Sequence, residues 1–486
     1  MIGRAAIGLA LALALVGRAN AQQAQVTTAP APGQAAQPAP AANAQPAAPP
    51  STPAPLLPAG VVPSRLTLSV SGSPADATFL DTQIRDALDR QIRPTLRPGA
   101  SIGYGPIVPW PLVPLAAGGL AAVNVTVTIG GGESATVTGV TTVDISNTVV
   151  QSAAPSVLFL SDDPEHIATE GLIFAGSVDA SRQARLYYYH DDIGLPRDID
   201  VVLTATAHAR VHVIQSEARP DLDVMSVGHT VSRDLLLYQL QNEGIVVDVA
   251  PGEPVVLRHD LLLAGELVAG AIDLHVLFGG PLKVSVIATP AGGNPLAYLA
   301  GPRMSLDGHN RHGTFDLDGF GVIKAAYTIG GPDAAVKYGV RSVSPRNVDT
   351  ADPGRDYGDY GVVHRIVFDM VNPTDASHPV YLYEKPLGGP VRSTFVVDGQ
   401  LKELGCARVA QPYWLMTYLV PPHTTGQSTT LTMTDGGSNY PLEFGMTESL
   451  PLPNTPPPNA VDGCSARPTP VPTAVATAPP TVPGSY

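Results

Sequence analysis

Short runs of alternating apolar and polar residues, separated by turns rich in Gly, Pro and Asp, are the feature that most limits how this sequence can fold. Between residues 156 and 290 such runs recur at roughly 10–15-residue intervals. A strand covered on one face alternates in this way, and many short strands with turn residues between them are typical of β-sandwiches. The runs cover residues 156–160, 171–174, 184–189, 199–204, 210–214, 245–249, 254–257 and 282–287.

The same pattern returns between residues 300 and 450. Turn chemistry such as Asn372-Pro-Thr-Asp375 and Asp435-Gly436 divides its strand-like segments. We therefore expect a mainly β fold with two β-sandwich (Ig-like) domains, at 156–290 and 300–450. A helical insertion is expected in the first domain at 232–242, ended by Gly244, because Gly is favoured just past a helix C-terminus.

Residues 65–152 have a different pattern. Leu80, Ile84, Leu88 and Ile92 recur every four residues with charged residues between them, which predicts an amphipathic helix that Pro94 ends. Residues 123–129 and 135–140 alternate strictly on either side of a Gly-rich turn and predict a β-hairpin. A small α+β domain is expected here, in front of the two sandwiches.

The two ends of the chain have the composition of disordered segments. Residues 22–64 contain eleven Pro and no Asp, Glu, Lys or Arg, and residues 451–486 hold another eleven of the 50 Pro. We expect a disordered Pro/Ala/Gln-rich linker at 22–64 and a Pro/Thr-rich tail at 451–486. Residues 1–21 have the short basic start, apolar run and small-residue site of a signal peptide, the alternative being an uncleaved anchor.

Charge and cysteine content restrict the compartment and the partners. The net charge is −14 without a Lys/Arg-rich run, so neither nucleic acid nor an anionic membrane surface is an expected partner. No later segment is apolar enough to span a membrane after signal cleavage. Cys406 and Cys464 are expected to pair in an oxidising, extracytoplasmic compartment (secreted, periplasmic or cell surface), with two free thiols as the alternative.

Residues 300–450 contain the motifs Arg311-His-Gly-Thr-Phe315, Tyr360-Gly-Val-Val363, Leu387-Gly-Gly-Pro390 and Gly436-Gly-Ser-Asn-Tyr-Pro441. In these motifs the chain resembles a group of uncharacterised secreted bacterial β-rich proteins. That group is often attached to domains named after the copper amine oxidase N-terminus, and no such domain is apparent in residues 65–152. The resemblance implies an extracytoplasmic β-rich protein and transfers no site residue.

One cluster has the residue types of a metal site. Asp307, His309, His312, Asp316 and Asp318 lie within twelve residues and offer nitrogen and oxygen ligands to a transition metal, or carboxylates to calcium. The cluster completes neither an EF-hand loop nor a zinc-protease motif. The alternative is a solvated, Gly-rich loop in which Asp and Asn side chains cap turns.

A second acidic loop carries four aspartates, with Tyr357, Tyr360 and His364 nearby. Paired carboxylates act as acid and base in sugar hydrolysis, and they also bind calcium. The composition is equally that of an ordinary surface loop. The four residues are Asp349, Asp352, Asp356 and Asp359.

Histidines and aromatic residues give further candidates. His208, Arg210 and His212 would share one strand face, which we interpret as exposed because His208 and His212 lie too far apart to bind one ion. Tyr187 and Tyr189 also share a face, and are interpreted as core residues with sugar stacking as the alternative. For Trp110 and Trp414, the sequence does not decide between core packing and sugar binding.

Several enzyme motifs are missing, including the Gly-x-Ser-x-Gly elbow and the phosphate-binding loop. The expected function is therefore a secreted or envelope-associated, non-catalytic binding or structural protein, whose partner is a cell-envelope polymer or protein. No cofactor is expected, with calcium as the alternative. The alternatives are a secreted hydrolase of envelope polysaccharide that uses the second acidic loop, and a surface protein that binds calcium or another metal.

Overall fold

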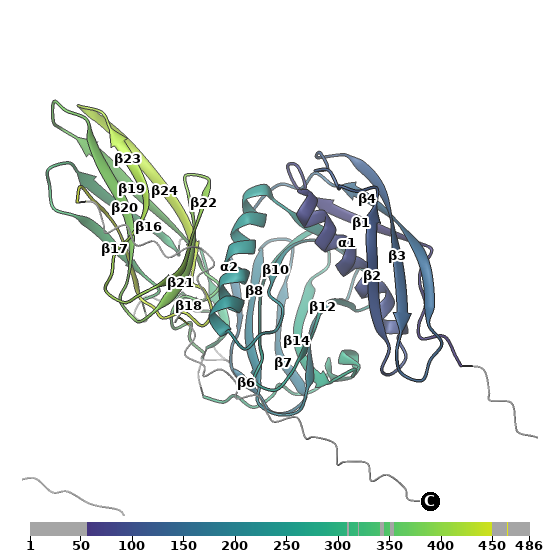
Figure 1. Ribbon diagram of the computed structural model, residues 1–486. Coiled ribbons are helices and arrows are strands. Elements are labelled where there is room, and N and C mark those ends of the chain that lie inside the picture. The colour runs from purple at the N-terminus through teal and green to yellow at the C-terminus, as the bar shows by residue number, and fades with distance from the viewer. Residues whose placement is uncertain are drawn as a thin grey trace, which may run out of the picture. The chain divides into compact units, whose positions relative to one another are not determined.

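The computed structural model describes residues 56–308, 311–318, 320–340, 345–349, 354–449 and 464, which belong to one compact unit beginning at Leu56 (Figure 1). The expected signal peptide, most of the linker and nearly all of the tail lie outside these residues, as do His309 and Asp352. Neither described helix combines the length and the apolar character that crossing a bilayer requires. The fold is mainly β, as the sequence predicts.

The first described segment combines a helix with four strands. Helix α1 (Ala77–Ile92) begins after Asp76, whose side chain accepts the N–H of Thr78, and it ends before Pro94 as expected. A short 3-10 turn, η1 (Arg93–Thr95), follows. The predicted hairpin is β3 (Leu120–Gly130) and β4 (Val137–Asn147). Strands β1 (Arg65–Ser71) and β2 (Ser101–Val108) flank it, and β2 was missed because Pro106 interrupts its pattern.

Residues 56–64, which were assigned to the linker, are packed against this segment. The N–H of Ala59 donates to the carbonyl of Ala135 at 2.8 Å, and Ala59 is fully buried. The N–H of Val61 donates to the Thr95 hydroxyl at 3.0 Å. Ordered packing therefore begins earlier in the chain than composition indicates.

The sheet of the first segment continues into the first sandwich. β1 runs parallel to β4 and antiparallel to β11, which joins both parts in one twelve-stranded sheet. One hydrophobic core fills the space under α1 and between the two sheets of the sandwich. The facing sheet has the order β12-β9-β14-β7. The strands are β5 (Val157–Ser161), β6 (His166–Ile167), β7 (Gly171–Val178), β8 (Ala184–Asp192), β9 (Arg197–Ala205), β10 (Ala209–Glu217), β11 (Gly244–Val249), β12 (Val255–Leu262), β13 (Leu267–Gly279), β14 (Leu282–Pro290), β15 (His312–Asp316) and β18 (Arg346–Asn347), with a 3-10 turn η2 (Pro295–Tyr298).

Helix α2 (Val224–Gln241) is longer than the sequence indicates. It begins eight residues before the expected start at Ser232, and the Asp223 carboxylate caps it by accepting the N–H of Ser226. It ends at Asn242, which takes the left-handed conformation with φ 53°. Gly244 was wrongly expected to hold the position past the helix and instead begins β11.

The second sandwich is built from two sheets with the orders β16-β19-β24-β21-β22 and β17-β25-β20-β23, around its own core. Helix α2 packs against β10 and β13 of the first sandwich and against β21 and β24 of the second (Figure 1). β15 and β18 fall in the range expected for the second sandwich but extend the twelve-stranded sheet, because β15 pairs with β5. The second sandwich contains β16 (Val322–Thr328), β17 (Ala334–Tyr338), β19 (Val363–Asn372), β20 (His378–Pro386), β21 (Val391–Val397), β22 (Gln400–Ala407), β23 (Tyr413–Val420), β24 (Thr424–Met433) and β25 (Leu442–Thr447).

Candidate functional site

The outer face of strands β1, β2, β3 and β4 is a candidate binding surface. Strand alternation turns Val123, Val125 and Val127 into the core beneath α1 and leaves Asn124 and Thr126 outside. Small hydroxyl and amide side chains dominate the outside, and we call this surface the hydroxyl face. Its polar residues are Thr67, Ser69, Ser101, Asn124, Thr126, Thr128, Thr138, Thr142 and Ser146, with Arg65 and Asp144.

Register and hydrogen bonds keep the hydroxyl face regular. Thr128 lies opposite Thr138 with their hydroxyls 3.2 Å apart, and the Thr142 hydroxyl donates to Asn124 Oδ1 at 2.8 Å. The two charges of the face pair with each other, since Arg65 Nη2 donates to Asp144 Oδ1 at 2.9 Å. This hydrogen bond lowers the pKa of Asp144. The face therefore presents ordered hydroxyls and almost no net charge.

An exposed tryptophan lies two residues beyond β2, the edge strand of this face. Trp110 follows β2 in a loop bracketed by Pro109 and Pro111, and 68% of its surface is exposed. Val108, two residues earlier, lies opposite Asn124 of the hydroxyl face and is also exposed. Each proline fixes its own backbone φ angle, so the chain on either side of Trp110 has few alternative conformations. The sequence did not decide between core packing and sugar binding for Trp110, and the structure places its ring at the surface.

The other aromatic candidates differ from Trp110. Trp414 is 37% exposed, and its Nε1 donates to the Thr417 hydroxyl at 3.0 Å. Tyr187 and Tyr189 are buried in the core beside α2, which confirms their interpretation as core residues. Among these four aromatics, Trp110 is the one that is free to stack on a ligand.

A cleft of about 450 Å³ lies where α2 and the strands of the first sandwich meet the second sandwich. Its floor is a buried ion pair: Arg185 Nε and Nη2 donate to the two carboxylate oxygens of Asp273 at 2.6 and 3.0 Å. Gln239 of α2 donates to the same carboxylate at 2.6 Å. The walls are mostly apolar and include Ile214, Leu317, Phe320, Val322, Val362, Val363 and Leu431.

The expected metal cluster is spread along β15. The Asp307 carboxylate accepts the backbone N–H groups of Glu165 and His166, and buried His312 lies 3.3 Å from Asp163. At the other end of β15, Asp316 accepts the N–H of Asp318 and pairs with Arg182 and Arg346. His312 and Asp316 are therefore about 13 Å apart along the strand.

In the part of the chain that the structure describes, no three His, Cys, Asp or Glu residues converge in a metal-binding arrangement. His309 lies outside that part, so the complete set Asp307, His309, His312, Asp316 and Asp318 stays a prediction.

The second acidic loop is turned into the protein at two positions. Asp356 is fully buried and accepts the N–H of Tyr360 at 2.8 Å, while burial and then Asp359 raise its pKa well above the usual range. Burial likewise raises the pKa of Asp359 to about 7. Neither residue lines the cleft. The loop therefore does not present these two carboxylates to a substrate.

The strand of His208, Arg210 and His212 was wrongly expected to expose all three side chains on one polar face. β10 lies in the interior of the twelve-stranded sheet, between β11 and β13. His212 is therefore buried, and its Nε2 lies 2.7 Å from the Ser71 hydroxyl. Burial lowers its pKa to about 4. His208, which precedes the strand, is exposed and pairs with Asp248 at 3.3 Å.

His229 is a buried residue that sequence reasoning missed. It lies on α2, and its two ring nitrogens contact Asp435 at 2.8 Å and Glu403 at 3.2 Å, both from the second sandwich. Burial alone would lower the pKa of His229, but the two carboxylates outweigh it and raise the pKa to about 9. His229, Asp435 and Glu403 come together only because α2 packs against the second sandwich. No local sequence motif predicts this contact.

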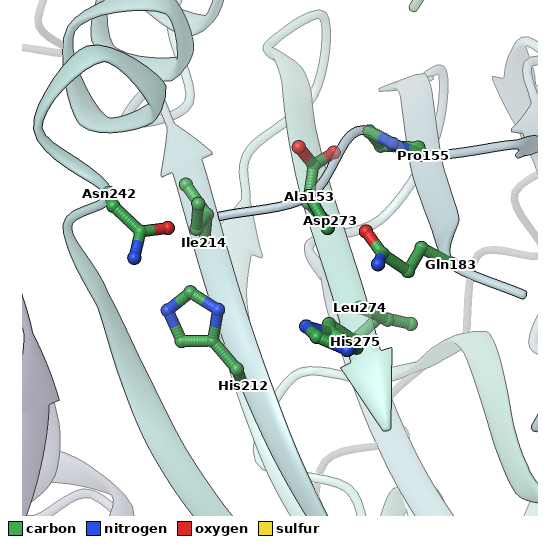
Figure 2. Close-up of a pocket in the computed structure, with 9 residues that line it drawn as sticks. All are labelled: Ala153, Pro155, Gln183, His212, Ile214, Asn242, Asp273, Leu274 and His275. Carbon is green, nitrogen blue, oxygen red and sulfur yellow. The ribbon is translucent and has the colours of Figure 1, made fainter. Parts of the chain in front are cut away.

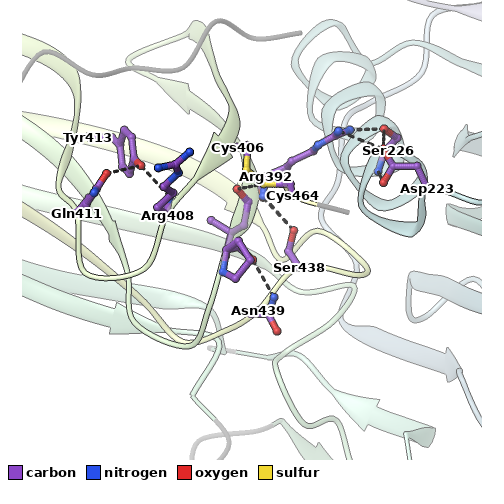
Figure 3. Close-up of a disulfide and its surroundings, with 12 residues drawn as sticks. Asp223, Ser226, Arg392, Cys406, Arg408, Gln411, Tyr413, Ser438, Asn439 and Cys464 are labelled. Atoms are coloured by element: carbon purple, nitrogen blue, oxygen red, sulfur yellow. Dashed lines mark hydrogen bonds and ion pairs between the residues drawn. A yellow bond between two sulfur atoms is a disulfide. The ribbon is translucent and has the colours of Figure 1, made fainter. Parts of the chain in front are cut away.

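The two cysteines that were expected to pair also lie at this junction. Cys406 of β22 and Cys464 form a disulfide with Cα atoms 5.7 Å apart (Figure 3). They pack against Met225 in the first turn of α2. Nearby, Arg392 of β21 pairs with Asp223 at 3.1 Å. The disulfide therefore joins Cys464 to the second sandwich beside α2.

Comparison with known proteins gives no family. No family model matches the sequence, and no curated protein matches it. One solved structure with a partial match is the M60 catalytic domain with the CBM51-1 and CBM51-2 domains of Clostridium perfringens ZmpB (9% identity, TM-score 0.13). That match covers 71% of this chain and 43% of the other.

Two further solved structures match at the same level. The CBM22-1–CBM22-2 tandem domain of Paenibacillus barcinonensis Xyn10C has 10% identity and a TM-score of 0.12, and the match covers 72% of this chain and 91% of that one. Lac15 from a marine microbial metagenome has 11% identity and a TM-score of 0.11, and the match covers 80% of this chain and 88% of that one. Likeness this weak transfers neither a ligand nor an activity, so function has to come from the chain's own residues.

Proposed function

We propose that this is a non-catalytic, extracytoplasmic protein that binds an uncharged polysaccharide of the cell envelope through the hydroxyl face and Trp110. The observation that carries the proposal is the exposure of Trp110 beside an ordered, nearly uncharged array of hydroxyls. An indole ring packs its flat apolar surface on a partner and keeps a polar N–H for hydrogen bonding. A sugar ring offers both an apolar face and hydroxyl groups to match.

Charge supports an uncharged polymer rather than an anionic one. The net charge of −14 repels polyanions, and the charges of the hydroxyl face, Arg65 and Asp144, are paired with each other. Hydroxyl and amide groups exchange hydrogen bonds with a neutral polyhydroxyl chain without a desolvated charge on either side. An uncharged polysaccharide therefore fits this face better than an anionic polymer or a membrane surface.

The compartment in this proposal comes from the signal-peptide pattern, the cysteine pair and the resemblance to secreted bacterial proteins. The hydrolase alternative is less well supported. Asp356 and Asp359 are buried away from the cleft, and Asp273 at the cleft floor is held by Arg185 and Gln239. None of these three carboxylates is positioned to reach a glycosidic bond.

Co-sedimentation of the mature protein with insoluble polysaccharides tests the proposal. Uncharged cell-wall glucans should retain the wild-type protein, and Trp110→Ala should lose most of that binding. Trp414→Ala is the matched control, because it removes the other tryptophan of the chain, and it should bind like wild type. Equal binding by Trp110→Ala and wild type, or retention on polyanions alone, would refute the proposal, as would release of soluble sugar from the pellet.

A further inference from the structure

Two histidines face each other across neighbouring strands of the large sheet. In the antiparallel pair of β10 and β13, His212 lies directly opposite His275. Residues in this relation share a face of the sheet, with Cβ atoms about 4.5–5.5 Å apart. Figure 2 shows both rings in one pocket, together with Asp273 and Asn242. The pair joins residues that are far apart in the sequence.

The hydrogen bonds around Ser71 assign the proton of His212 to one of its two ring nitrogens. The Ser71 hydroxyl donates to the carbonyl of Asn242 at 2.7 Å, so its oxygen is left to accept a hydrogen bond from His212 Nε2 at 2.7 Å. Nε2 therefore holds the proton, and Nδ1 carries the lone pair. Figure 2 shows the Nε2 side of the ring toward Asn242 and the Nδ1 side toward β13, where His275 lies.

We infer that His212 Nδ1 and the His275 ring bind one divalent transition-metal ion of the zinc–copper class, with water completing its coordination. Imidazole nitrogen is a preferred ligand of these ions. A metal-binding histidine usually donates its other N–H to a second group, as His212 does to Ser71. Among the described residues, no third His, Cys, Asp or Glu side chain joins the pair. With two protein ligands, the site binds an ion less strongly than a structural zinc site does.

The surroundings of the pair favour this class of ion. The nearest carboxylate in the pocket, Asp273, is occupied by Arg185 and Gln239. Calcium and magnesium prefer oxygen ligands and gain nothing here.

The pocket has room for an ion and a route to it. Its volume of about 10 Å³ takes one water-sized occupant, the ion itself, and the coordinating waters come from the larger cleft that adjoins it. It shares Ala153, Pro155, Ile214 and Asp273 with the larger cleft, and His275 is only half-buried. An ion therefore reaches the pair from the cleft without unfolding the sheet.

Titration calorimetry of the full mature protein with zinc chloride, in a non-coordinating buffer at pH 7.5, tests the inference. Wild-type protein should bind one equivalent of zinc, and calcium chloride should give no heat above dilution. His275→Ala should weaken zinc binding by roughly tenfold or more. His208→Ala is the matched control, since it removes an exposed histidine that lies outside the pocket, and it should bind like wild type.

Two further variants keep the test decisive. His212→Ala should also weaken binding, but His212 is buried, so His275→Ala carries the conclusion if His212→Ala does not fold. His312→Ala removes a residue of the separate cluster around β15 and should leave zinc binding unchanged. Loss of binding in His312→Ala with retention in His275→Ala overturns the inference, as does a wild-type protein that binds no zinc.

Discussion

Single residues of this protein sit in environments that oppose their usual charge state, and Asp359 is a clear case. Its backbone has φ 56°, in the left-handed region that Asn and Asp tolerate best after Gly. Burial raises the pKa of its carboxyl to about 7, far above the value of an unfolded chain. The stability that Asp359 contributes is therefore complete below about pH 4 and is lost as the pH rises through 7.

Asp359→Asn should for this reason flatten the pH dependence of stability. Asn accepts the left-handed backbone and carries no charge, so the variant should melt higher than wild type at pH 8 and close to wild type at pH 4. Scanning calorimetry across this range measures the difference. A variant that melts lower than wild type at pH 8 would contradict the burial argument.

The ion pair of Arg185 and Asp273 is a second residue-scale test. The Arg185 side chain is 2% exposed, and breaking a buried pair by removing one partner costs about 3–5 kcal/mol. Urea unfolding should therefore show a large loss for Arg185→Met. Arg65→Met removes an exposed pair and should leave the midpoint unchanged. Equal effects of the two substitutions would show that burial does not set the strength of these pairs.

At the scale of elements, α2 connects the two sandwiches, and Gly228 shows how closely it approaches the second one. A Cβ built on Gly228 would lie 2.0 Å from the carbonyl oxygen of Gly436. A Gly→Ala change inside a helix normally stabilises it by about 1 kcal/mol. Gly228→Ala should do the reverse and lower the melting temperature, because the backbone of Gly436 has no room to move aside. A rise in melting temperature would contradict this contact.

The same helix shows what the sequence could and could not predict. Hairpin β3–β4 was predictable because one face is buried and the other exposed, so its residues alternate. The first half of α2 was not predictable from the sequence. Ser226, Gly228 and His229 contact the second sandwich there, and none of them is a strong helix former. β13 was missed because it is buried on both faces along most of its length and does not alternate.

The candidate sites were less predictable than the elements. Pairing of His212 with His275 depends on the register of β10 and β13, which no local pattern reveals. The exposure of Trp110 depends on how its loop leaves β2, since its apolar neighbours are equally suited to a core.

At the scale of the whole molecule, the disulfide ties Cys464 to the second sandwich. Closing a loop over a sequence separation of 58 residues stabilises a fold by about 4 kcal/mol in the chain-entropy model. Unreduced, denatured protein should show no reactive thiol, and the Cys406→Ser/Cys464→Ser double variant should melt lower than wild type. Two reactive thiols before reduction would show that the pair is open in the isolated protein.

The central claim is that Trp110 meets an uncharged polysaccharide, and the chain's two tryptophans allow a direct measurement. In Trp414→Phe, Trp110 is the only tryptophan, and its fluorescence reports on the proposed surface alone. Soluble neutral glucan at saturation should protect it from acrylamide quenching. In Trp110→Phe, the remaining Trp414 should be quenched equally with and without glucan. Unchanged quenching of Trp110 across neutral glucans, or equal protection of both tryptophans, would contradict the account.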